Sequence, residues 1–253
     1  MNWLHRFFRF SLLVSCLLPA LAAAQPLRQT PTIEHHQPPL ELRPDSHQLI
    51  ATDRLTVRGG ASGQELEFSL APALELERIE DVTRCQDPCE SAPQLMFRRE
   101  HIAGGTALSR VILSQPASGA NDRPVLLKFS YRGVIDDPPR DPRHLRFVTP
   151  SETSGHIGPE GVYLSSESQW YPDLDDSLAT YDVRIVLPEG WSAVTQGTAQ
   201  SDPAHWIVST NSEALTVVAN RFVVKTRPWK AQSGQAVLLA TYLFPDEAAL
   251  ADE

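Results

Sequence analysis

A close pair of cysteines is the first feature whose residue types and spacing could do chemistry. Cys85 and Cys89 flank Asp87 and Pro88 in the segment CQDPC. Two thiols at this spacing could form a disulfide or bind a metal, but a metal needs further ligands, and only Asp87 and Glu90 stand nearby. We therefore expect a disulfide between Cys85 and Cys89. A ring this short stabilises a turn by about 2 kcal/mol and does not hold a whole fold together.

An aromatic and acidic stretch, GVYLSSESQWYPDLDD from Gly161 to Asp176, is the second such feature. Trp170 and Tyr171 precede Pro172 where a solvated loop would be expected. Large aromatic rings at this place could stack on a ligand or anchor the segment against a core. Because strands are expected around it, we interpret Trp170, Tyr171 and Pro172 as structural residues: the rings pack inward and the proline turns the chain away.

The rest of the sequence shows no reactive constellation. It contains no His-Glu-x-x-His, no Gly-x-Ser-x-Gly, no glycine-rich phosphate loop and no cysteine set spaced for zinc. The histidines are scattered, and the acidic clusters lack the spacing of a calcium loop. We therefore predict no catalytic residue, no metal ligand and no cofactor in this chain. The residues considered are His35, His36, His47, His101, His144, His156, His205, Asp136, Asp137, Asp173, Asp175 and Asp176.

The N-terminus has the order of a secretory signal peptide: two arginines, an apolar run, and small residues ending at Ala24. We expect residues 1–24 to be removed by cleavage after Ala24, and the protein to be periplasmic or secreted. A lipid anchor on Cys16 is the alternative, because the segment LVSC matches the pattern that precedes a lipid-modified cysteine. Loss of the two arginines makes the formal charge of −9 more negative still, so nucleic acid is not expected as a partner.

The chain after the signal peptide divides into a leader and a β domain. Residues 25–46 are rich in proline, polar and without period, which predicts a flexible linker. From residue 47 to residue 244 the dominant period is two. The segments QELEFSL, VLLKFSYRG and YDVRIVLP each alternate apolar and polar residues. This pattern predicts an all-β domain of antiparallel strands, within the size that β-sandwiches and barrels reach as one domain.

The C-terminal end has a different pattern. Residues 236–244, AVLLATYLF, are apolar on both faces, as in a central strand or a strand covered by a second body. Pro245 breaks this strand, and residues 245–253 contain a capping aspartate followed by strong helix formers. We expect the stub of a helix here, at the start of a further domain.

Several segments, taken in order between residues 47 and 244, resemble the N-terminal domain of M1-type zinc metallopeptidases, the aminopeptidase N-like gluzincins. The most specific are EGVYLSSESQWYPDL and YDVRIVLPEGWSAVTQG. The resemblance implies a saddle of β-sheets that packs against a thermolysin-like catalytic domain, where zinc and peptide substrates bind. Because the zinc motif is absent here, we expect the chain to end before its catalytic domain and to be inactive alone.

The resemblance also implies one substrate contact. In the family, the N-terminal domain lends a Gln or Glu to the pocket for the substrate's first side chain, from a position upstream of the proline in the aromatic stretch. Glu167 is the nearest match in this sequence, and Gln169 is the second.

A stand-alone periplasmic β-sandwich that binds a glycan or a protein partner is the alternative function. Its stacking surface would come from the aromatic residues, because rings of this size bind sugars and side chains by stacking. The candidates are Trp170, Tyr171, Trp191, Trp206 and Trp229.

Overall fold

The computed structural model describes residues 30–59, 65–85, 89, 91–101, 109–114, 123–138, 153–174, 177–234 and 236–252. The expected signal peptide with Ala24 and Cys16 lies outside these residues, as do Asp87, Glu90 and the acidic pair Asp175 and Asp176. Among the described residues, no helix has the length and apolar character that a membrane span requires.

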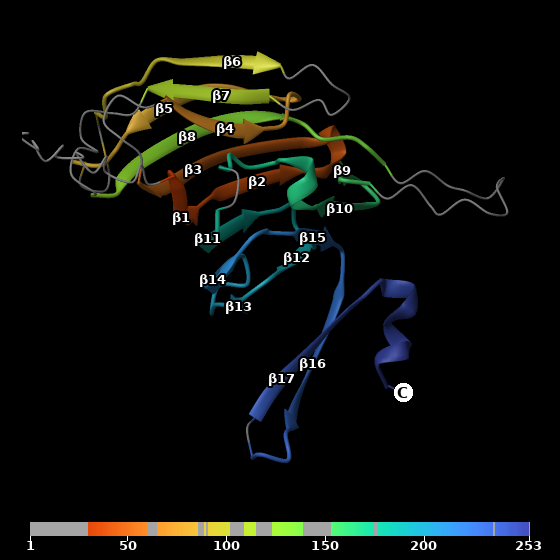
Figure 1. The fold of residues 1–253 in the computed structure, drawn as a ribbon. Coiled ribbons are helices and arrows are strands. Elements are labelled where there is room, and N and C mark those ends of the chain that lie inside the picture. Colours follow the sequence, from red (N-terminus) through yellow and green to blue (C-terminus); the bar gives the residue numbers. More distant parts are fainter. Residues whose placement is uncertain are drawn as a thin grey trace, which may run out of the picture.

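The described chain forms four β-sheets (Figure 1). The largest holds β1 (Thr32–Gln37), β2 (Pro39–Arg43), β3 (Gln48–Arg58), β5 (Leu74–Asp81), β8 (Val125–Val134), β11 (Ala179–Val186), β13 (Thr198–Ala199) and β14 (His205–Ser212). A second sheet has β9 (Gly155–Gly158), β10 (Gly161–Leu164), β12 (Ser192–Thr195) and β15 (Val217–Asn220). A third has β4 (Glu65–Leu70), β6 (Phe97–His101) and β7 (Ser109–Ser114), and a two-stranded ribbon has β16 (Val223–Lys230) and β17 (Ala236–Leu243).

The alternating pattern of the sequence accounts for the core. Along β3 every second residue is buried, and β4, β8 and β11 follow the same rule over most of their length. The buried faces of these strands join in one hydrophobic cluster. The prediction of an all-β fold with mostly antiparallel strands is therefore confirmed. The exceptions are β1 and β2, which both pair with β11 in parallel.

The prediction of a flexible linker at residues 25–46 is wrong for its described part. Strands β1 and β2 lie end to end between β3 and β11, inside the largest sheet. Ile33, Leu40 and Leu42 are buried there. The prediction relied on the proline content of this segment, because proline is usually excluded from central strands. Here Pro38 falls in the break between the two strands, and its carbonyl still accepts a hydrogen bond from the Arg184 N–H, at 3.2 Å.

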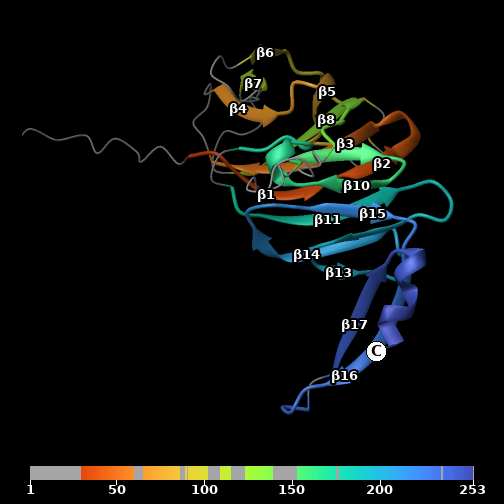
Figure 2. The same ribbon diagram turned by 90° about the vertical axis from the view of Figure 1, so that its right-hand side faces the viewer.

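The ribbon of β16 and β17 extends away from the other sheets in both views (Figures 1 and 2). Among the strands that the structure describes, β17 pairs with β16 alone, so the segment 236–244 is not a central strand of the described sheets. Its apolar side chains are exposed: Leu238 is 69% and Phe244 is 46% accessible. Residues Pro245–Asp252 form a 3-10 helix, η4, where the stub of a helix was expected.

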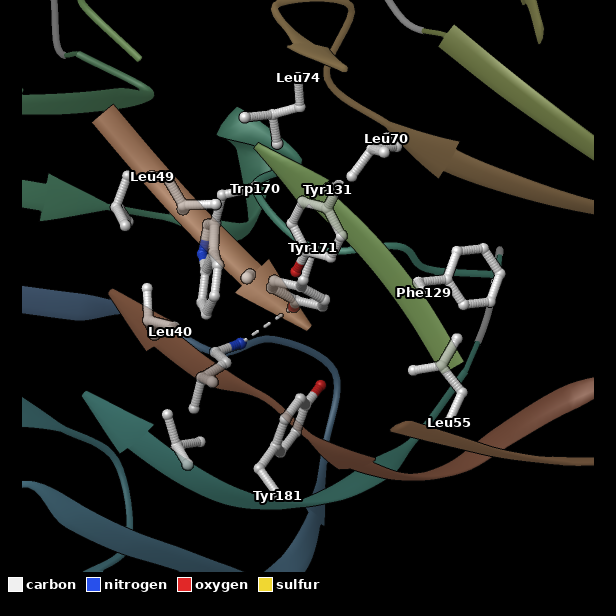
Figure 3. Packing of buried hydrophobic residues seen from close by; sticks show 14 of the residues in the cluster. Leu40, Leu49, Leu55, Leu70, Leu74, Phe129, Tyr131, Trp170, Tyr171 and Tyr181 are labelled. Carbon is white, nitrogen blue, oxygen red and sulfur yellow. Dashed lines mark hydrogen bonds between the residues drawn. The ribbon is translucent and has the colours of Figure 1, made fainter. Parts of the chain in front are cut away.

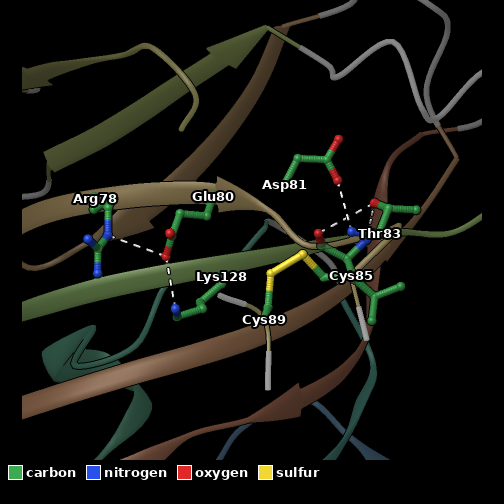
Figure 4. Close-up of a disulfide and its surroundings, with 8 residues drawn as sticks. Arg78, Glu80, Asp81, Thr83, Cys85, Cys89 and Lys128 are labelled. Atoms are coloured by element: carbon green, nitrogen blue, oxygen red, sulfur yellow. Dashed lines mark hydrogen bonds and ion pairs between the residues drawn. A yellow bond between two sulfur atoms is a disulfide. The ribbon is translucent and has the colours of Figure 1, made fainter. Parts of the chain in front are cut away.

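The expected disulfide between Cys85 and Cys89 is present (Figure 4). It follows β5 after a turn in which the Cys85 N–H donates to the carbonyl of Val82, at 3.1 Å. The carboxylate of Asp81 accepts a hydrogen bond from the Thr83 N–H in the same turn. The disulfide therefore closes a short local ring at the end of a strand, as its spacing predicts.

Candidate functional site

The segment Gly161–Leu174 builds the candidate site. It begins with β10, continues as the short 3-10 helix η3 (Ser166–Ser168), and turns at Gln169. Gln169 has a φ of 49°, a left-handed conformation that a residue other than glycine adopts only at a cost. This turn directs Trp170 into the core while Glu167 stays at the surface.

Trp170 and Tyr171 anchor this segment (Figure 3). Trp170 is fully buried, and its ring meets the Tyr171 ring edge to face, with centroids 4.7 Å apart. The Tyr171 hydroxyl accepts a hydrogen bond from the Leu215 N–H, at 3.2 Å. Burial raises the pKa of Tyr171 to about 12, because the ionised phenolate would lose its hydration. Both rings thus pack inside the protein, and Pro172 is buried beside them.

Backbone hydrogen bonds tie the segment to the end of β4. The carbonyl of Gln169 accepts from the Ala71 N–H, at 2.9 Å. Ser69 and Asp173 exchange two backbone hydrogen bonds, of 2.8 and 3.1 Å. The loop that carries Glu167 is therefore held at both of its ends, by β10 before it and by β4 after it.

A pocket of about 580 Å³ opens between these elements. Glu167 and Gln169 both line it, so the fold brings the two sequence candidates together. Asp173 and Glu213 add two more carboxylates, and no lysine or arginine is among the described residues that line the pocket. The Oε1 atom of Gln169 is buried without a hydrogen-bond partner in the described chain. A concave site rich in carboxylates favours a cationic group such as a primary ammonium.

A buried polar pair near this anchor was not predicted from the sequence. His36 was expected in a solvated leader, but it is 1% exposed, and its Nδ1 lies 2.8 Å from Oδ2 of Asp53. The His36 ring stacks on Tyr181 and meets Tyr171 edge to face. The alternation in β3 does indicate that Asp53 is buried, because Asp53 occupies one of the alternate positions that point to the same face as the apolar residues of the strand.

The aromatic residues proposed for glycan stacking do not form one exposed surface. Trp170, Tyr171 and Trp206 are buried. Trp191 packs partly against the core and lies under the Arg221 guanidinium, whose carbon is 5.1 Å from the ring centroid. Trp229 is 51% exposed, on the ribbon. The described structure therefore gives no support to the glycan-binding alternative.

Comparison with known proteins shows similarity in fold, at low sequence identity. No protein-family model matches the sequence, and no curated protein matches it. Among solved structures, a mutant M1 zinc metallopeptidase from Deinococcus radiodurans is 17% identical with a TM-score of 0.56, over 83% of this chain and 47% of that chain. Native yeast LTA4 hydrolase is 12% identical with a TM-score of 0.54, over 78% and 30%. Aminopeptidase A of Legionella pneumophila, solved with aspartic acid, is 13% identical with a TM-score of 0.57, over 87% and 25%.

These likenesses confirm the expected fold. The described strands share their arrangement with a region of M1 zinc metallopeptidases, and the chain spans less than half the length of each of the three solved structures.

Proposed function

We propose that this chain serves as the non-catalytic N-terminal β domain of an exported, M1-like zinc metallopeptidase of the aminopeptidase type. One observation carries the proposal: the fold matches M1 peptidases over 83% of this chain but over only 47% of the matched chain. The remainder of such a peptidase would be the partner of this domain. The signal-like N-terminus supports export.

The residues present do not fit the catalytic zinc of such an enzyme. That ion takes two histidines from one His-Glu-x-x-His helix, and the sequence has no such motif. The described histidines that lie near carboxylates sit on strands or beside them. No step of peptide hydrolysis is therefore assigned to this chain, and the zinc would belong to the catalytic domain.

The contribution of this domain would be to hold the substrate. The pocket beside Glu167 offers three carboxylates to the ammonium group of a peptide's N-terminus, with Gln169 as an additional polar contact. Backbone hydrogen bonds to β4 and to the residue after it hold Gln169 and Asp173 in place, so this part of the pocket loses little conformational freedom when a substrate binds.

The ribbon offers a surface for the catalytic domain. A two-stranded hairpin is only marginally stable by itself in water, and exposed apolar area on such an element marks an interaction site. Five apolar residues exceed one third exposure on the ribbon itself: Val224, Trp229, Val237, Leu238 and Leu239.

Two measurements test the proposal. The purified 253-residue chain should not hydrolyse aminoacyl or peptide substrates with zinc added, and zinc-dependent hydrolysis by it would overturn the proposal. The gene should continue in frame beyond codon 253 and encode His-Glu-x-x-His within about one domain length.

In the longer polypeptide, Glu167→Gln should raise KM for peptides more than it lowers kcat, because it removes a binding contact. Glu189→Gln, on an exposed turn after β11, is the matched control and should leave both constants unchanged. Equal kinetics for the two variants would exclude Glu167 from substrate binding.

A further inference from the structure

Three side chains that the sequence separates widely converge at the junction of two sheets. His47 immediately precedes β3, Asp136 follows β8, and His156 lies in β9. Each offers one ligand atom, and the three atoms lie within 4.8 Å of one another. None of the three residues lines the pocket beside Glu167. The spacing of these three residues along the sequence gives no sign that they meet.

Backbone pairing holds the cluster in shape. The Ile157 N–H donates to the Ile135 carbonyl, at 3.0 Å, and Asp136 forms an isolated bridge with His156. The carbonyl of His47 accepts from the Ile135 N–H, also at 3.0 Å. His47 has a φ of 55°, and such left-handed residues other than glycine gather at functional sites.

His156 carries the strongest signal in the cluster. Its residue is 4% exposed, and its Nδ1 is a buried nitrogen without a hydrogen-bond partner in the described chain. A buried polar atom in this state costs free energy unless a ligand satisfies it. This nitrogen lies 3.2 Å from Oδ1 of Asp136, whose side chain is 44% exposed.

Glu160 determines which nitrogen of His156 is available. Its Oε1 lies 2.6 Å from Nε2, so a neutral His156 ring donates from Nε2 and keeps its lone pair on Nδ1. A carboxylate behind a histidine is the usual support of a metal-bound imidazole. Gly158 makes room for this pair, because a Cβ there would meet Nε2 of His156 at 2.1 Å.

We propose that His47, Asp136 and His156 bind a divalent transition-metal ion of the kind that prefers imidazole and carboxylate, such as Zn²⁺. Nitrogen and oxygen donors of these types suit zinc. The Nδ1 of His47 lies 3.6 Å and the Nδ1 of His156 lies 3.2 Å from Oδ1 of Asp136. Ligands of a tetrahedral zinc stand about 3.4 Å apart, since each lies about 2.1 Å from the ion.

Two features set the character of this site. The Nδ1 of His47 also lies 2.6 Å from the Ile157 carbonyl, so metal binding replaces that hydrogen bond. The side chains of His47 and Asp136 are 33% and 44% exposed, which leaves solvent to complete the coordination. The ion would join β3 and β8 of the largest sheet to β9 of the second sheet, and so it would stabilise the fold.

Metal titration of the full chain, prepared without a histidine tag and stripped with chelator, tests the site. The chain should bind one Zn²⁺, and its melting temperature should rise with zinc concentration, as for any ligand of the folded state. Co²⁺ should give the visible absorption of a site with low coordination number. Absence of both zinc binding and a thermal shift would overturn the proposal.

Two variants locate the binding. His47→Asn keeps a residue that tolerates a left-handed backbone, and Asp136→Asn changes an exposed side chain, so both should fold. Each should weaken zinc binding by roughly tenfold or more, as losses around metal ligands do. His205→Gln is the control, because it removes a histidine paired with Asp182 outside the cluster. Equal affinity in the wild type and in both cluster variants would place the metal elsewhere and refute the site.

Discussion

Asp53 accepts a hydrogen bond from the Gln37 N–H through Oδ1, at 3.1 Å, and its Oδ2 lies 2.8 Å from Nδ1 of His36. The Asp53 carboxylate thus pairs with the side chain of His36 and with the backbone N–H of Gln37. These two residues immediately precede Pro38, where β1 and β2 are separated. The carboxylate connects β1 to β3 at the point where the ladder between strands cannot continue, because proline has no N–H.

Removal of the Asp53 carboxylate should strongly destabilise the protein. Asp53→Ala leaves the buried His36 ring and the Gln37 N–H without their partner, and breaking such a buried pair costs about 3 to 5 kcal/mol. Urea denaturation measures the loss. Asp182→Ala, which removes the partner of His205 in a partly exposed pair, should cost well under half as much. A smaller loss for Asp53→Ala than for this control would contradict the assigned role.

Trp170→Ala should also lower the melting temperature, because Trp170 has a structural role and is not part of a binding surface. The Trp170 ring is the largest fully buried side chain, and truncation of such a ring costs about 3 to 5 kcal/mol through lost burial and the cavity left behind. The matched control is Trp229→Ala, since that ring is 51% exposed on the ribbon. Thermal unfolding of both variants is the measurement. An unchanged melting temperature for Trp170→Ala would show that the ring is not an anchor.

The sequence predicts local elements well and their insertion into the sheet poorly. Alternation in segments such as QELEFSL predicts both a strand and its buried face, because both depend on neighbouring residues. The position of β1 and β2 depends instead on pairing with β11, more than a hundred residues away. The pairing of His36 with Asp53 depends on the same insertion. A proline-rich leader gives no local sign of it.

The candidate sites likewise depend partly on local sequence and partly on contacts between distant segments. The position of Glu167 came from a resemblance to a known motif, and the pocket around it became visible only when Asp173 and Glu213 met it in the fold. His47, Asp136 and His156 belong to three segments without any metal-binding spacing. Backbone pairing of the residues that follow β8 brings them together: Asp136 bridges to His156 in β9, and the Ile135 N–H donates to the His47 carbonyl.

Alkaline pH should destabilise the protein through its buried tyrosines. Tyrosine in an unfolded chain ionises near pH 10, whereas burial raises the pKa of Tyr171 to about 12 and also raises the pKa values of Tyr131 and Tyr181. Between about pH 10 and 12 the unfolded state therefore holds fewer protons than the folded state, and the free energy of unfolding falls as pH rises.

Urea unfolding on either side of pH 10 measures this effect, and ultraviolet absorbance of tyrosinate follows the ionisation directly. Tyr171→Phe removes one of the titrating groups, so its stability should depend less steeply on alkaline pH than that of the wild type. Identical slopes for the two proteins would show that Tyr171 ionises equally in the folded and unfolded states.

The ribbon should tolerate a charge that the core would not. Leu238 is 69% exposed on β17, so Leu238→Lys should leave the free energy of unfolding of this chain within about 0.5 kcal/mol of the wild type, as for surface substitutions in general. The same change should reduce the binding of a hydrophobic dye, because it replaces an exposed apolar side chain with a charge on the ribbon face where Leu238 lies opposite Pro228. Leu127→Lys, in the core of β8, is the contrasting variant and should unfold the protein. A large thermal loss for Leu238→Lys would mean that the residue is already covered within this chain, and the proposed docking surface would then have to be abandoned.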